Sequence, residues 1–102
     1  MEHILAERTL KVEVDGQPDA TLRVVVGLPV MVRDAEYKTD IEFHGPGAGA
    51  VLERWTIGGD AWQSVRHAFW ICRDLARSVC NTNARITYQG DENWSEEMPP
   101  VP

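Results

Sequence analysis

The chain has 102 residues, of which 43% are apolar and 25% charged, with 16 acidic side chains against 10 basic ones. This length and composition predict one globular domain, because such a chain buries roughly two thirds of its unfolded surface and contains no long low-complexity tract. The net charge of −6 argues against a nucleic-acid backbone or an anionic membrane as partner, since both require a concentrated cationic surface.

The apolar runs and the cysteines indicate the cellular compartment of the protein. No apolar run approaches the roughly 20 residues that span a bilayer, and residues 1–6 lack the basic stretch and apolar core of a secretion signal. Cys72 and Cys80 fall in one predicted helix, about 12 Å apart, which is too far for a disulfide between them. Two reduced thiols are typical of the cytoplasm, so we expect a soluble cytoplasmic protein.

Alternating apolar residues predict the first two strands. Apolar and polar residues alternate from 10 to 14, and this strand begins near Leu5. A turn with Gly and Pro spans residues 15–19, and residues 21–32 alternate again, which predicts a β-hairpin. Pro29 cannot donate a ladder hydrogen bond, so the second strand ends there or lies at a sheet edge beyond that point.

A glycine-rich loop separates the third and fourth strands. Residues 36–43 alternate between apolar or aromatic side chains and a charged face that must meet water, made of Glu36, Lys38, Asp40 and Glu42. Residues 45–50 form the loop, and residues 51–57 form a strand that carries Leu52, Trp55 and Ile57. The strands follow at hairpin-like intervals, so the sheet is predicted to be mostly antiparallel.

A helix is predicted over residues 61–79, after Gly58-Gly59 ends the strand pattern. The Asp60 carboxylate can accept a hydrogen bond from the free amide of Gln63, while Gln63 reaches back to the Asp60 amide, as in a capping box. A broad apolar stripe then packs on the sheet. It comprises Trp62, Val65, Ala68, Phe69, Ile71, Cys72, Leu75, Ala76 and Val79.

Together these elements predict an α+β fold of order ββββαβ, a mostly antiparallel four- to five-stranded sheet with one long helix packed on one face. A short strand over residues 85–89 closes a single domain spanning residues 1–89. Residues 90–102 form an acidic, Pro-rich tail whose only large anchor is Trp94. The predicted core comprises Leu10, Val12, Leu22, Val24, Val26, Ile41, Phe43, Trp55, Val65, Phe69, Cys72, Leu75 and Ile86.

Several short motifs follow one another along the chain in a characteristic order. They are an opening strand Ala6-Glu7-Arg8-Thr9-Leu10, a Val-rich strand running into Gly27-Leu28-Pro29, a Gly-Asp start to an apolar helix, a short aromatic strand and a closing Pro. With its motifs in this order, the chain resembles a family of small uncharacterised bacterial domains, which is classed as a domain of unknown function. Where that family's helix often continues with Gln-Ala, this chain has Trp62-Gln63-Ser64. The resemblance implies the fold and no catalytic residue.

The spacing of the histidines and cysteines indicates neither a metal site nor a catalytic nucleophile. His3, His44 and His67 are far apart, and neither a Cys-x-x-Cys nor a His-Glu-x-x-His element is present. His67 and Cys72 lie on one helix and point about 140° apart, so they form no dyad without another element. We expect no catalytic, metal-binding or cofactor-binding residue.

Glycines and carboxylates also favour structural roles. Residues 45–50 lead into a strand and present no helix N-terminus to a phosphate, and the Asp60 carboxylate would repel an anion from the helix that it caps. Three acidic residues on the third strand are spaced by two along one exposed face, which is most simply a solvated face. They are Glu36, Asp40 and Glu42.

One helix face has the composition of an interaction surface. Its candidate partner-binding residues are Arg66, Trp70, Arg73 and Arg77. They recur at four, three and four residues and so form one stripe opposite the core-facing stripe. Trp and Arg are enriched among the residues that anchor protein interfaces. The alternative is that the tail covers Trp70 and that Glu96 and Glu97 pair with the arginines.

Three classes of function remain open. The sequence favours a small non-enzymatic protein-binding module of bacterial type, for instance an immunity or antitoxin-like inhibitor of a partner protein. The first alternative is a structural homo-oligomer that pairs through the uncovered sheet face or an open edge strand. The second is a small-molecule-binding protein or enzyme, which requires a pocket at the sheet.

Overall fold

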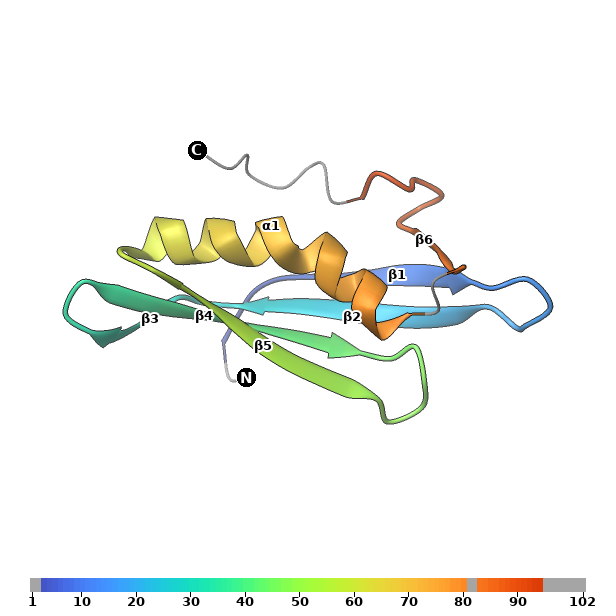
Figure 1. The fold of residues 1–102 in the computed structure, drawn as a ribbon, viewed down its shortest axis with the longest axis horizontal. Helices are drawn as coiled ribbons and strands as arrows, with labels where there is room; N and C mark the ends of the chain where they lie inside the picture. The colour runs from blue at the N-terminus through green and yellow to red at the C-terminus, as the bar shows by residue number, and fades with distance from the viewer. Residues whose placement is uncertain (1–2, 81–82, 95–102) are drawn as a thin grey trace.

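One helix lies along one face of a curled antiparallel sheet (Figure 1). The computed structural model describes residues 3–80 and 83–94. In chain order the elements are β1 (Ile4–Glu13), β2 (Ala20–Gly27), β3 (Val30–Arg33), β4 (Glu36–His44), β5 (Val51–Gly58), α1 (Ala61–Val79) and β6 (Arg85–Thr87). All strand pairs are antiparallel, which confirms the predicted α+β fold with one helix on one face of the sheet.

Within the described residues, six strands occupy five positions in the sheet, because β2 and β3 lie along the same side of β4. Across the sheet the order is β5, β4, β2 with β3, β1 and β6. The sequence predicted one strand over residues 21–32, ending at Pro29 or lying at an edge beyond it. Both outcomes occur, since β2 ends at Gly27 and β3 pairs, among the described strands, with β4 alone.

The sheet face beneath α1 carries the core. Seven predicted core residues of the strands are no more than 3% exposed: Leu10, Val12, Leu22, Val24, Val26, Ile41 and Phe43. The buried side chains of α1 are small and four residues apart: Ser64, Ala68, Cys72 and Ala76. Small side chains let the helix approach the strands closely. The predicted core residues Phe69, Leu75 and Ile86 are half-buried and pack against the edge of the core cluster. Val65 is half-buried but lies outside the cluster, so its prediction as a core residue was wrong.

Trp55 does not belong to the core, and that prediction was wrong. In the β4–β5 register Trp55 lies opposite Asp40, on the face of the sheet that α1 leaves open. Its side chain is 59% exposed, and the Lys38 Nζ lies 4.9 Å from the centre of the ring. Successive side chains of a strand point to opposite faces. Leu52 points toward α1, so Trp55, three residues later, points away from it.

The start of α1 is held by the predicted cap. The Asp60 Oδ1 accepts a hydrogen bond of 2.7 Å from the Gln63 amide, as expected. The Gln63 side chain reaches back to the amide of Gly59, at 2.6 Å, rather than to that of Asp60. A buried hydrogen bond of 2.8 Å between Thr39 Oγ1 and Ser64 Oγ joins the same turn to β4. The first turn of α1 is therefore fixed both by its cap and by the sheet.

The chain after β6 folds back onto the domain. The predicted last strand over residues 85–89 ends at Thr87, and Tyr88 and Asp91 then form a bridge that closes a turn. Trp94 is 3% exposed and belongs to the core cluster. Arg8 donates a hydrogen bond of 2.9 Å to the Trp94 carbonyl and lies over the Tyr88 ring. Trp94 is thus an anchor, as its sequence position suggested.

Candidate functional site

The side of α1 turned away from the sheet carries two tryptophans and three arginines, and we call it the outer face of α1. It comprises Trp62, Arg66, Trp70, Arg73 and Arg77. At 100° per residue these five positions fall within an arc of about 80°. Trp70 is 59% exposed, Arg77 is exposed, and Arg66 and Arg73 are half-buried. The four residues singled out from the sequence therefore share one surface.

Trp62 belongs to this surface and was wrongly predicted to join the core stripe. Its side chain is 72% exposed. The predicted stripe included every large apolar residue of the helix except Trp70, whereas the buried line passes through Ser64 and its successors at intervals of four. The signal that could have found Trp62 is its spacing of four residues from Arg66 and eight from Trp70, which repeats the spacing of the outer face.

An open cleft of about 430 Å³ lies between the C-terminal half of α1 and the chain around β6; we call it the arginine cleft. It is lined by Arg73, Arg77, Ala84, Ile86, Glu92, Asn93 and Trp94. Arg73 and Arg77 also belong to the outer face of α1, so the cleft continues that surface toward β6. The indole of Trp94, held in the core, forms one of its walls.

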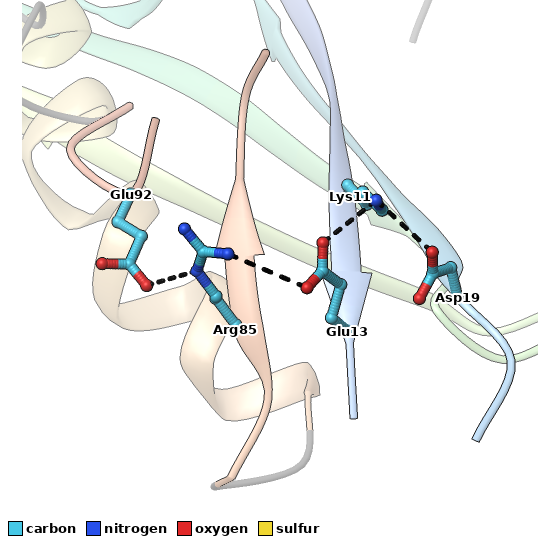
Figure 2. Close-up of polar contacts among 5 residues, drawn as sticks. All are labelled: Lys11, Glu13, Asp19, Arg85 and Glu92. Carbon is cyan, nitrogen blue, oxygen red and sulfur yellow. Dashed lines mark hydrogen bonds and ion pairs between the residues drawn. The ribbon is translucent and has the colours of Figure 1, made fainter. Parts of the chain in front are cut away.

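The acidic group in the cleft is already paired (Figure 2). The Arg85 Nε donates a hydrogen bond of 2.6 Å to a Glu92 carboxylate oxygen, and its Nη1 lies 3.9 Å from Glu13. Glu13 in turn pairs with Lys11 at 3.0 Å. The hydrogen bond to Glu92 raises the pKa of Arg85, and the bond to Glu13 raises the pKa of Lys11. These exposed ion pairs contribute little to stability. The pair with Arg85 nevertheless offsets the charge of Glu92.

The alternative in which the tail covers Trp70 concerns residues 90–102, of which the structure describes residues 90–94. Glu96 and Glu97 lie outside the described residues. Trp94, the last described residue of that segment, lines the arginine cleft and leaves Trp70 59% exposed. The described part of the segment therefore packs beside the outer face of α1 and not over its central tryptophan.

The histidines are separated by the fold and engaged locally. His44 Nε2 lies 2.9 Å from a Glu42 carboxylate oxygen on β4, and His67 Nδ1 lies 3.0 Å from the Ile57 carbonyl oxygen at the end of β5. Within residues 3–80 and 83–94, no three His, Cys, Asp or Glu side chains meet in a group that could hold a metal ion.

The three carboxylates of β4 that were weighed as acid and base lie in separate pairs, and the Glu36 and Glu42 side chains are partly buried. Glu36 pairs with Arg33 at 2.8 Å, Asp40 with Lys38 at 3.5 Å, and Glu42 with His44. Asp40 and Glu42 project from the open face of the sheet, which agrees with the charged face expected from the sequence. The glycine-rich loop closes the β4–β5 hairpin, where the Gly45 amide donates to the Ala50 carbonyl at 2.8 Å.

The two thiols are expected to react very differently with iodoacetamide. Both cysteines are free, and burial raises the pKa of the Cys72 thiol to about 12 and also raises the pKa of the half-buried Cys80 thiol. Only the thiolate reacts, so Cys80 should be alkylated first, faster as the pH rises, while Cys72 should resist until the protein unfolds. Mass spectrometry should find two adducts after alkylation in urea. A disulfide-bonded mass, or rapid labelling of Cys72, would contradict this.

No family model matches the chain, no curated protein matches it, and no solved structure matches its fold. The resemblance to a family of bacterial domains therefore stays a prediction. Among the described residues, no helix is long and apolar enough to cross a membrane.

Proposed function

We propose that this chain is a non-enzymatic protein-binding module that docks one partner protein through the outer face of α1. The observation that carries the proposal is the exposure of Trp62 and Trp70 on the same helix face as three arginines. Exposed apolar patches often mark interaction sites, and Trp and Arg dominate the binding energy of protein interfaces. Neither tryptophan contributes to the core of the domain.

The kind of partner follows from charge and from the sequence resemblance. The net charge of −6 disfavours a nucleic-acid backbone or an anionic membrane, and the Trp and Arg side chains of the outer face of α1 favour a protein. A small bacterial domain of this kind suits an immunity or antitoxin-like inhibitor that blocks a partner by occupying its surface. The two free thiols are in keeping with work in the cytoplasm.

Substitution of Trp70 tests the docking face directly. Trp70→Ala and Arg73→Glu should each weaken capture of the partner from the native host by about thirty-fold or more, since loss of an anchor commonly costs about 2 kcal/mol. Both should shift the free energy of unfolding by less than about 0.5 kcal/mol. Trp55→Ala is the matched control, because Trp55 is also 59% exposed but lies on the opposite side of the sheet.

Two results would count against the docking face. A Trp70→Ala protein that melts several degrees lower and still captures its partner would show that Trp70 is structural. Equal losses of capture in Trp70→Ala and Trp55→Ala would show that binding does not depend on the outer face of α1.

The open face of the sheet favours a second candidate, a homo-oligomer. Its apolar side chains lie on β3 and β5 and are 40% to 59% exposed: Val30, Val32, Val51, Trp55 and Ile57. Burial of such residues against a second copy would favour association. Light scattering separates the two candidates, since a monomer at micromolar concentration would exclude the oligomer and leave the docking module.

A further inference from the structure

We propose that the arginine cleft binds a carboxylate side chain from an acidic segment of the partner protein. The inference rests on the proposed function, because the cleft shares Arg73 and Arg77 with the outer face of α1. The inference adds the chemistry of the partner. The partner segment would carry an acidic residue next to an apolar one, and it would bind where the outer face of α1 meets the chain around β6.

Among the described residues, Arg73 and Arg77 are the two arginines without a hydrogen-bond or ion-pair partner. All eight arginines of the chain lie among the described residues, and six of them have partners. Those six are Arg8, Arg23, Arg33, Arg54, Arg66 and Arg85. In the described part of the chain Arg73 and Arg77 make no ion pair and no hydrogen bond, although acidic side chains outnumber basic ones by 16 to 10. Two unpaired guanidinium groups on one wall of a cleft are a site for an anion.

Arg73 and Arg77 also have a suitable spacing on α1. Arg73 and Arg77 are four residues apart on α1, so they are neighbours on one helix face, about 6 Å apart along the axis. Each planar guanidinium can donate two parallel hydrogen bonds to a carboxylate. The pairing of Glu92 with Arg85 at 2.6 Å keeps the one acidic group of the cleft from occupying that role (Figure 2).

The arginine cleft also has an apolar wall. Trp94 is 3% exposed and is held by the core and by the bond from Arg8 to its carbonyl, while Ala84 and Ile86 are half-buried. Apolar groups beside a guanidinium lower the local dielectric and strengthen an ion pair formed there. Ala84 and Ile86, which are only half-buried, offer contact area to an apolar side chain next to the bound carboxylate. A wall held rigidly before binding lowers the entropic cost of association.

A nucleic-acid backbone or a phosphorylated membrane lipid fits this site less well. Two arginines form a small cationic site in a chain of net charge −6, whereas a phosphate backbone requires a row of basic groups. One carboxylate can accept hydrogen bonds from both guanidinium groups, and it neutralises one of their two positive charges.

Peptide titration of the full-length protein tests the cleft. The probes are acetyl-Leu-Glu-Glu-Leu-amide and its matched peptide with Gln in place of Glu, and the signals followed are the side-chain NH resonances of Arg73, Arg77 and Trp94. The Glu peptide should shift all three and bind at least about ten-fold more tightly than the Gln peptide, with an affinity that falls as salt is added. Arg73→Gln combined with Arg77→Gln should abolish the difference between the peptides. Arg54→Gln, an exposed arginine on β5, should leave it unchanged.

Several results would overturn the proposal. Equal affinity of the two peptides, or undiminished discrimination in the double variant, would show that the cleft does not recognise carboxylates. Residues 95–102 are the competing occupant, since they follow Trp94 and carry Glu96 and Glu97. If Glu96→Gln with Glu97→Gln, in the full chain, moves the Arg73 and Arg77 signals opposite to the shifts caused by the Glu peptide, the site belongs to the chain's own tail.

The same data separate the cleft from the docking face. If partner capture depends on Trp70 but the Glu peptide does not bind, the docking face stands and the acidic partner is wrong. If the peptide binds in the cleft but Trp70→Ala leaves partner capture unchanged, the carboxylate site stands and the proposed docking face is wrong.

Discussion

Trp94→Ala is expected to lower the free energy of unfolding by about 3–5 kcal/mol, the usual cost of truncating a buried aromatic residue. Trp94 is 3% exposed and packs in the same cluster as Leu10 and Phe43. It lies after the last strand, in a segment whose composition predicted an acidic tail. Domains of this size are stable by roughly 5–15 kcal/mol, so the loss should be visible in a urea melt as a large fall in the midpoint.

The chain supplies its own controls for this substitution. Trp55→Ala and Trp70→Ala remove the same side chain from positions that are 59% exposed, and each should change the free energy of unfolding by less than about 0.5 kcal/mol. Equal midpoints for all three variants would mean that Trp94 does not belong to the cooperative core. A selective effect at Trp94 would show that residues 88–94 are part of the folded domain.

Gly58→Ala is expected to destabilise the protein by about 1–3 kcal/mol, because the site has no room for a Cβ. Gly58 ends β5 and is buried directly beneath the first turn of α1. A Cβ there would collide with the backbone amide nitrogen of Ser64 and would lie 2.9 Å from the backbone carbon of Gln63. These are backbone atoms of a helix that is held by its cap and by the sheet, so they cannot move aside cheaply.

Gly59→Ala is the matched control for Gly58→Ala. A Cβ at Gly59 would meet only the end of the flexible Gln63 side chain, at 3.4 Å. The free energy of unfolding should therefore change by less than about 0.5 kcal/mol. Thermal melts of both variants test the argument, and similar melting temperatures would show that α1 does not lie against Gly58 as closely as the structure indicates.

The two candidate surfaces hold different exposed apolar residues. The outer face of α1 combines Trp62 and Trp70 with arginines, whereas the open sheet face combines Trp55 with residues of β3 and β5. The first has the charge and composition of a site for another protein, and the second offers apolar area. Capture of the partner and light scattering address them separately.

Local patterns in the sequence were sufficient to predict most of the elements. The helix over residues 61–79 matches α1, because its start depends on Asp60 and Gln63, which act within one turn. The strands and their core residues such as Leu10 and Phe43 were also predicted, since alternation with a period of two directly reflects one buried face. The break at Pro29 followed from its missing amide proton.

The four tryptophans show what the sequence alone did not determine. Trp94 is buried, while Trp55, Trp62 and Trp70 are at least 59% exposed. Whether a strand residue meets the helix depends on its register with the neighbouring strand, and that placed Trp55 opposite Asp40 on the open face. Burial of Trp94 depends on contacts with residues far away in the chain, such as Arg8, which no local pattern records.

The candidate site divides in the same way. The sequence by itself determined the stripe of Arg66, Trp70, Arg73 and Arg77, because helical spacing alone brings these positions to one face. Only the tertiary structure decided that Arg73 and Arg77 border a cleft, since its opposite wall comes from residues 84–94. Packing of that segment on β1 and α1 involves contacts across most of the chain, and a pattern of neighbouring residues contains no information about them.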